Sequence, residues 1–265
     1  MHSVVTVIAL VLSLLLPSSA GAIEPTVFLE DMTWTEVRDA VAAGRTTIIV
    51  PVGGTEQSGP HMALGKHNVR VRILAGRIAA QLGNALVAPV VAYVPEGDVA
   101  GTAGHIRFAG TISVTPEAFR GVLEGSSRSF RRAGFRDIVL IGDHGGYQSD
   151  LAAVAAKLNH EWSGTQIRVH FVPEFYKTQT EPFTAALRQR GLTDAQIGTH
   201  AGSADTSLML ALDPRLVRAD RLAQPPSAAD GTYGDPRPST AALGQAGVDL
   251  IVAAGVNAIR RAAVR

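Results

Sequence analysis

The feature that most constrains this chain is a regular alternation between short apolar runs and stretches with the spacing of amphipathic helices. Apolar runs predict buried strands at residues 46–52, 85–93, 137–141 and 166–172. Helical spacing and capping residues predict helices at residues 33–43, 68–83, 115–134, 149–162, 182–190, 206–212 and 240–263. Strands and helices that alternate in this way form a mainly parallel sheet with helices on both faces.

A single domain is expected over residues 23–265. A chain of 265 residues, of which 46% are hydrophobic, can bury one sizeable core, and no repeat or linker divides it. Basic and acidic residues are nearly balanced, at 24 and 23. Nothing in this composition indicates a nucleic-acid partner, which would require basic residues clustered on one face.

Residues 1–22 have the pattern of a cleavable signal peptide. Residues 4–16 are almost wholly apolar but too short to span a bilayer comfortably, and the small residues Ala20, Gly21 and Ala22 follow them. This pattern predicts cleavage after Ala22 and a periplasmic or secreted protein with no membrane association afterwards. Because only His2 supplies positive charge before the apolar run, an uncleaved anchor stays open as the alternative.

The residue types limit the possible chemistry. The chain has no cysteine, so a metal ion must be held by His, Asp or Glu. The turns after the predicted strands lack the Gly-x-Ser-x-Gly pattern of a serine nucleophile. Neither a phosphate-binding P-loop nor a dinucleotide-binding glycine motif occurs. Metal-assisted chemistry is therefore the best supported class.

Candidate metal ligands follow two of the predicted strands. Glu56, His61 and His67 lie after the strand at 46–52, and Asp143 and His144 come directly after the strand at 137–141. In open parallel sheets, ligand sites gather beyond the carboxyl ends of the strands. Histidine and carboxylate ligands suit Zn²⁺ or Mn²⁺. Each residue alone could equally be a hydrogen-bonded loop residue, so the convergence of two loops carries the prediction.

A third segment, His200-Ala-Gly-Ser-Ala-Asp-Thr-Ser, adds His200 and Asp205 to the candidates. The structural alternative is that Asp205 or Ser203 caps the apolar helix that follows. The two roles are compatible, because one residue can cap a helix while its neighbour faces a site. His105 is a further candidate near the same rim.

Five segments, in order along the chain, resemble motifs of the creatininase (creatinine amidohydrolase) family. The first is Pro51-Val-Gly-Gly-Thr-Glu-Gln-Ser-Gly-Pro-His-Met-Ala-Leu-Gly, which resembles the signature Pro-x-Gly-Ser-x-Glu-Gln-His-Gly-Pro-His-Leu-Pro-Leu-Gly-Thr-Asp. The others are Phe108-Ala-Gly-Thr-Ile-Ser, Ile141-Gly-Asp-His-Gly-Gly, His200-Ala-Gly-Ser-Ala-Asp-Thr-Ser and Tyr233-Gly-Asp-Pro. The chain is therefore identified as a divergent, exported member of this family.

The resemblance implies a three-layer α/β/α sandwich, a homo-oligomer that is often a hexamer, and a metal-dependent hydrolase. Family members commonly hold two divalent ions, which share a bridging Asp. This chain departs from that pattern, because Ser58, His67 and Gly146 stand where ligands of the second ion are expected. A neutral imidazole has one lone pair and cannot bridge two cations. We therefore expect one ion per chain, Zn²⁺ or Mn²⁺, held by Glu56, His67 and His144.

The expected reaction is hydrolysis of a carbon–nitrogen, amide-type bond in a small molecule or peptide, with metal-bound water as the nucleophile. His200 and Asp205 are expected to transfer protons, with His61 in reserve. The altered ligand set argues against creatinine itself as the substrate. Two alternatives stay open: an exported, non-catalytic ligand-binding protein on the same fold, and an isomerase or lyase that works by metal polarisation.

Overall fold

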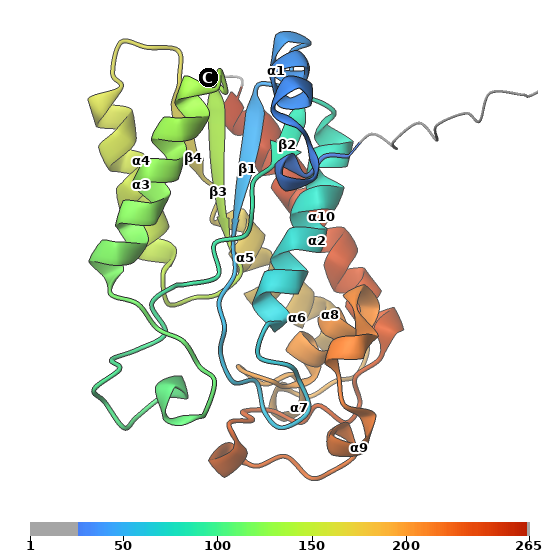
Figure 1. The fold of residues 1–265 in the computed structure, drawn as a ribbon. Helices are drawn as coiled ribbons and strands as arrows, with labels where there is room; N and C mark the ends of the chain where they lie inside the picture. Colours follow the sequence, from blue (N-terminus) through green and yellow to red (C-terminus); the bar gives the residue numbers. More distant parts are fainter. Residues whose placement is uncertain (1–25, 264–265) are drawn as a thin grey trace, which may run out of the picture.

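The computed structural model of the protein describes residues 26–263. The predicted signal peptide, residues 1–22, lies outside the described residues, so export stays a prediction. Four strands form one sheet in the order β2-β1-β3-β4, and every neighbouring pair is parallel (Figure 1). The strands are β1 (Thr47–Val52), β2 (Ala85–Val87), β3 (Asp137–Gly142) and β4 (Arg168–Phe171).

Ten α-helices accompany the sheet in the described part of the chain. They are α1 (Trp34–Ala42), α2 (Lys66–Leu82), α3 (Pro116–Arg132), α4 (Gln148–Glu161), α5 (Glu174–Thr180), α6 (Pro182–Gln189), α7 (Asp194–Ile197), α8 (Ser203–Leu212), α9 (Ala219–Leu222) and α10 (Ala241–Ala263). Capping explains where α1 and α3 begin. Thr33 forms a reciprocal capping box with Glu36, and Thr115 caps α3 with Pro116 in its first turn.

The sheet separates two hydrophobic cores, because side chains alternate between its faces. On one face, Ile48, Val50 and Leu140 pack against α3, α4 and part of α1. On the other face, Ile49 and Ile141 pack against α2, α5, α6, α8 and α10. Helices thus cover both faces, which confirms the predicted three-layer α/β/α sandwich with a parallel sheet.

Three details differ from the sequence-based prediction. Helix α2 begins at Lys66 rather than at Asn68, whose side chain instead accepts a hydrogen bond from Gly54 N–H and donates one to Thr55 Oγ1. Strand β2 ends at Val87, and the residues after it run on as extended chain that touches β1 through one bridge, Val52 to Val91. Helices α5, α7 and α9, which are short, were not predicted.

The last helix, α10, is long and apolar enough to cross a membrane by length and composition alone. Half of its most apolar window is nevertheless buried within the protein, where α10 packs on α8, α5 and α2. Glycines permit the close contact with α8, since a Cβ at Gly244 would overlap the carbonyl oxygen of Ser207. The apolar character of α10 is therefore accounted for by the core.

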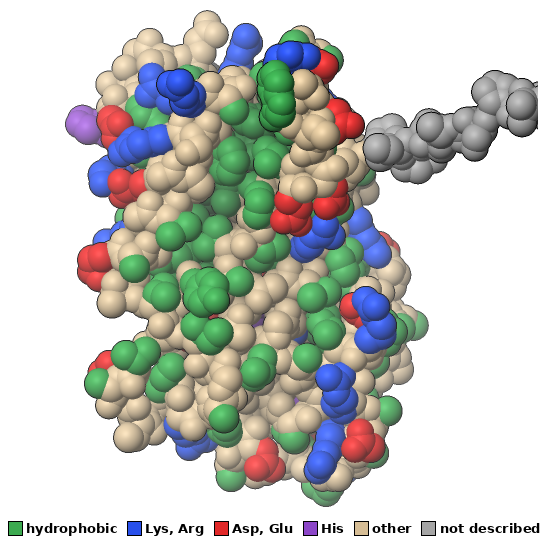
Figure 2. Space-filling model, viewed as in Figure 1, with side chains coloured by type: hydrophobic (Ala, Val, Ile, Leu, Met, Phe, Trp, Pro, Cys, Tyr) green, Lys and Arg blue, Asp and Glu red, His purple; other side chains and the backbone are tan. Residues whose placement is uncertain are grey.

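The chain segments that follow the strands gather at one end of the sheet, together with α6, α7, α8 and α9 (Figure 1). At the opposite end of the sheet, Figure 2 shows apolar side chains exposed on one face of the molecule, between neighbouring helices. An apolar groove lies there between α1 and α3, lined by residues that include Leu29, Trp34, Val37 and Phe130. The end of the sheet where these loops gather is the place where a ligand site is expected in a parallel sheet.

Gly244→Ala is expected to destabilise the protein by about 1–3 kcal/mol, because the added methyl group forces α10 away from α8. Gly121→Ala is the matched control, since Gly121 lies on α3 with open space around it. That change is expected to stabilise by about 0.5–1 kcal/mol through helix propensity. Urea unfolding of both variants measures the two effects, and equal effects would contradict the close packing of α8 and α10.

Candidate metal centre

A cavity of about 530 Å³ opens at the carboxyl ends of β1 and β3. Its lining includes Glu56 from the loop after β1, His144 from the loop after β3, and His200 from the segment before α8. The sequence-based prediction that these loops converge at one edge of the sheet is thus met by the geometry. His105 also lines this cavity, from the long segment between β2 and α3.

Tyr147 ties the two strand-end loops together. Its buried hydroxyl accepts hydrogen bonds from the backbone N–H groups of Asp143 and His144, each at 3.1 Å. The same hydroxyl donates to the carbonyl oxygen of Gly53 at 2.6 Å. One side chain therefore fixes the loop that carries Glu56 relative to the loop that carries His144.

The Gly-Thr-Ile-Ser segment at 110–113 fastens the loop of Glu56 from the other side. Thr111 Oγ1 accepts a hydrogen bond from Gln57 N–H at 3.1 Å, and Ile112 N–H donates to the carbonyl of Thr55 at 2.9 Å. Ser113 Oγ accepts from Glu96 N–H at 3.0 Å. This family-like motif therefore positions residues 55–57 and Glu96 without itself touching the cavity.

Glu56 is the centre of the site. Its side chain is fully buried, and four imidazoles lie within 4 Å of its carboxylate. The nearest is His67 Nε2, at 2.8 Å from Oε1. The others are His144 Nε2 at 3.7 Å and His105 Nδ1 at 3.8 Å from Oε2, and His200 Nδ1 at 3.8 Å from Oε1. A buried carboxylate surrounded by imidazoles has the ligand types of a zinc or manganese site.

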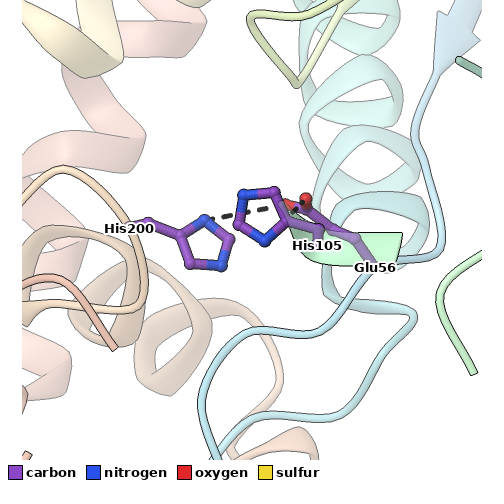
Figure 3. A group of neighbouring side chains, drawn as sticks. All are labelled: Glu56, His105 and His200. Atoms are coloured by element: carbon purple, nitrogen blue, oxygen red, sulfur yellow. Dashed lines mark ion pairs between the residues drawn. The ribbon is translucent and has the colours of Figure 1, made fainter. Parts of the chain in front are cut away.

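Two groups around Glu56 have ligand atoms close enough to share one ion. The first is Glu56 with His105 and His200, whose side chains point toward one another in Figure 3. The second is Glu56 with Glu96 and His144. In each group the ligand atoms lie within 4.8 Å of one another. Of the three ligands predicted from the sequence, Glu56 and His144 thus fall within one such group.

His67 is the predicted ligand that the structure places differently. Its Nδ1 lies 2.6 Å from Asp143 Oδ2 while its Nε2 lies 2.8 Å from Glu56 Oε1. Both ring nitrogens are therefore engaged by carboxylates, and neither has a lone pair directed at a shared ion. In this conformation His67 orients Glu56 rather than joining either ligand group.

Arg70 anchors the floor of the site. This fully buried residue donates to Asp143 Oδ2 at 2.7 Å and to Asp205 Oδ1 at 2.8 Å. Lys66, also fully buried, lies 3.2 Å from Asp205 Oδ2. Burial alone would raise the pKa of Asp143, but Arg70 and His67 together hold it below its usual value. Lys66 and Arg70 likewise hold the pKa of Asp205 well below its usual value, against the effect of burial.

The three residues predicted to transfer protons lie in different surroundings. His200 lines the cavity, and its Nε2 donates to the carbonyl of Gln57 at 2.9 Å, which leaves Nδ1 facing Glu56. Asp205 also lines the cavity but is held by Lys66, Arg70 and Ala201 N–H. His61 is buried against Thr206 Oγ1, at 3.0 Å, and is not among the residues that line the cavity. Their catalytic roles stay predictions.

Two of the histidines around Glu56, His144 and His200, are neutral at pH 7. Burial lowers the pKa of His144 to about 4 and that of His200 to about 3, and Lys66 adds to both effects. Neutral imidazoles keep the lone pair that metal binding or proton abstraction needs. Glu96 responds in the opposite direction, since burial and then the neighbouring Glu56 raise its pKa to about 9.

Three functional residues were missed from the sequence. Glu96 is the first acidic residue after the second predicted strand, in Val-Pro-Glu-Gly, and that position was a usable signal. Lys66 and Arg70 occupy adjacent turns on the buried face of α2, where Val71 and Leu74 are also buried. Charged residues on the inward face of a helix need partners, which identifies them as candidates for a buried network.

The chain is similar to several known proteins. A family model described as "Creatininase: Creatinine amidohydrolase" matches residues 30–259. A creatinine amidohydrolase of Pseudomonas putida is 30% identical over 78% of the chain and 80% of that protein. A mycofactocin precursor peptide peptidase of Mycolicibacterium smegmatis is 32% identical, over 66% of the chain and 61% of that protein.

Solved creatininase structures are similar over almost their whole length. A manganese form aligns with a TM-score of 0.73 and 27% identity, covering 90% of this chain and 99% of that one. A mutant in a Zn–Zn form aligns with a TM-score of 0.71 and 28% identity, covering 90% of this chain and 98% of that one. Proteins of this fold that carry manganese or zinc are therefore similar to the chain throughout its described sheet and helices.

Arg70→Met is expected to destabilise the protein by about 3–5 kcal/mol, because it leaves Asp143 and Asp205 buried without their shared cation. Arg72→Met is the matched control two residues along α2. Arg72 is partly exposed and pairs with Glu30 at the surface, so its loss is expected to cost at most about 1 kcal/mol. Chemical unfolding compares the two, and equal costs would show that the Arg70 network does not stabilise the fold.

Acid is expected to destabilise the protein partly through His61. Burial lowers the pKa of His61 from 6.5 to about 4, so between these pH values the unfolded chain binds more protons than the folded one. The free energy of unfolding therefore falls as the pH drops through this window, and His61→Gln is expected to reduce that fall. The comparison variant is His160→Gln, at an exposed position of α4. An unchanged pH profile in His61→Gln would contradict the assignment.

Proposed function

Because the chain belongs to the creatininase family, we propose that it is a metal-dependent hydrolase of an amide-type carbon–nitrogen bond in a small molecule or peptide. The observation that carries this proposal is the position of Glu56, which is buried among four imidazoles at the floor of the cavity. Relatives and structural neighbours are metal-dependent amidohydrolases, and the solved neighbours carry manganese or zinc.

The residues present fit a divalent ion. Within residues 26–263, Glu56 Oε2 has no hydrogen-bond partner although it is fully buried. A buried, unpaired carboxylate oxygen is costly, and a cation compensates for it. Bound to Glu56, a divalent ion would supply Lewis acidity, polarise the scissile carbonyl group and make a water molecule more acidic.

The chain's own residues supply proton transfer and orientation. His200 keeps Nδ1 unprotonated and directed toward Glu56, because its Nε2–H donates to the carbonyl of Gln57. It is therefore suited to take a proton in the cavity and return it to the leaving nitrogen. Gln57 also donates from its side-chain amide to His105 Nδ1 at 2.7 Å, which orients the second histidine on the same side.

The cavity and the relatives indicate the substrate class. A cavity of about 530 Å³ is in the size range of small-molecule sites. Tyr176 and Tyr233 line it together with Thr180, Thr184 and Thr199, so it offers both flat apolar surfaces and hydroxyl groups. The relatives act on creatinine in one case and on a precursor peptide in another. Residues 58, 67 and 146 depart from the creatininase signature, which favours an amide other than creatinine.

Three further expectations belong to this proposal. Export after cleavage at Ala22 rests on the sequence pattern of residues 1–22. A homo-oligomer is expected from the family resemblance. One ion per chain is expected because Ser58 and Gly146 offer no ligand where the signature would provide one for a second ion.

We expect about one Zn²⁺ or Mn²⁺ per chain by elemental analysis, and hydrolysis of at least one compound in a screen of cyclic amides and short peptides. Removal of the ion by a chelator should abolish turnover, and its return should restore it. His200→Asn is expected to lower kcat by about 10²–10⁴ while the protein stays folded, as for other general acids and bases.

His160→Gln is the control for this measurement, because His160 lies on α4 outside the cavity. A protein that binds no divalent ion after reconstitution, and turns over nothing in the screen, would favour the non-catalytic binding protein instead.

A further inference from the structure

We propose that Glu96 is a ligand of the metal ion, which lies among Glu56, Glu96 and His144, while His105 and His200 face the substrate. This inference rests on the proposed metal-dependent function and deepens it. Glu96 lies outside the five segments of the chain that resemble motifs of the family. In this chain Glu96 thus takes the role that His67, engaged by two carboxylates, does not fill.

Glu96 is buried without a partner. Its side chain is fully buried, and within residues 26–263 neither of its carboxylate oxygens has a hydrogen-bond partner. The facing Oε2 of Glu56 is in the same state. Two carboxylates that face each other away from water repel and lack solvation, so the arrangement is stable only when a proton or cation lies between them.

His144 completes a ligand set with these two carboxylates. Its Nε2 lies 3.7 Å from Glu56 Oε2, and its Nδ1 lies 3.5 Å from Glu96 Oε2 and accepts a hydrogen bond from Gly146 N–H at 3.2 Å. One ring thus spans both acidic side chains, and the ligand atoms of the group lie within 4.8 Å of one another. Two carboxylates and one imidazole suit Mn²⁺ or Zn²⁺.

In the competing group, His105 is already engaged at the nitrogen that faces Glu56. The Gln57 amide donates to His105 Nδ1 at 2.7 Å. His105 is also accessible, with 27% of its side chain exposed against 0% for Glu96. An accessible imidazole that already accepts a hydrogen bond at this nitrogen is better suited to meeting a substrate than to holding an ion beneath it.

Two glycines make room for the proposed ligands. A Cβ at Gly54 would lie 2.6 Å from Glu96 Oε1, and one at Gly146 would lie 3.0 Å from His144 Cε1. The family signature has serine at the position of Gly54. Here a side chain at this position would need the space that Glu96 Oε1 occupies, and the positive φ of Gly54, +149°, also favours glycine.

The charges beneath the cavity favour a cation. Four carboxylates, of Glu56, Glu96, Asp143 and Asp205, lie around it, and Lys66, Arg70 and the imidazole of His67 lie among them. With Glu96 ionised, the carboxylates outnumber the cationic groups in a poorly solvated region. A divalent cation at Glu56 and Glu96 offsets this excess where it lies.

The test is calorimetric titration of the chelator-treated protein with MnCl₂ and with ZnCl₂. We expect Glu96→Gln and His144→Ala to weaken binding at least about 100-fold, the upper range seen even for groups that only support a ligand. His105→Asn and His200→Asn should stay within about tenfold of the parent protein. Gly54→Ser, which keeps every ligand residue but crowds Glu96 and strains the backbone at Gly54, should also weaken binding.

Thermal melting of the metal-free proteins provides the structural control. Without metal, Glu96→Gln should melt at or above the melting temperature of the parent, because it buries an amide in place of an acid. With metal added, it should lack the rise in melting temperature that the parent shows. Parent-like affinity in Glu96→Gln would overturn the inference and leave the proposed function intact, as would loss of binding only in His105→Asn and His200→Asn. Absence of binding in the parent itself would instead reject the proposed function.

Discussion

The arrangement of the site depends on the buried guanidinium of Arg70. From α2 it reaches Asp143 at the end of β3 and Asp205 in the first turn of α8, at 2.7 and 2.8 Å. Three segments that are far apart in the sequence are thereby fixed to one another through charge. Because none of these groups can return to water without unfolding, the network holds the cavity floor in one arrangement. His67 belongs to the same network, because it contacts Asp143 through Nδ1 and Glu56 through Nε2, and it thereby fixes the position of Glu56.

His67 also shows how the centre differs from the family signature. The family pattern implies a carboxylate at this position that holds two cations. Here an imidazole lies between two carboxylates, at 2.6 Å from Asp143 and 2.8 Å from Glu56. A hydrogen-bonding imidazole thus stands where the signature has a metal-binding carboxylate. Lys66 and Arg70, which pair with the neighbouring Asp205 and Asp143, supply positive charge from the protein itself. A centre of this kind needs fewer metal ions to be electrically balanced.

The sequence predicted the layers of this fold well, because β1 and β3 are buried apolar runs and helices such as α3 have clear caps. It also predicted that Glu56 and His144 converge, since strand ends meet at one edge, and the family resemblance placed His200 near them. The role of His67 could not be predicted, because motif position does not reveal which nitrogen a carboxylate engages. Glu96 was missed for a related reason: its segment leaves the sheet after Val87 and is positioned by contacts with Ser113, far away in sequence.

The segment between Glu96 and Thr111 has fixed ends and an exposed middle, and these two parts differ in how freely they can change in evolution. Both of its ends are fastened, at Glu96 by Ser113 and at Thr111 by Gln57, whereas much of what lies between is exposed and carries His105. Exposed loops tolerate insertions and substitutions far better than the strands that support them. Selection can therefore lengthen, shorten or re-sequence this loop, and so change which molecules the cavity admits, without disturbing the groups beneath it. Descendants of this chain can diversify in substrate while they inherit one unchanged centre.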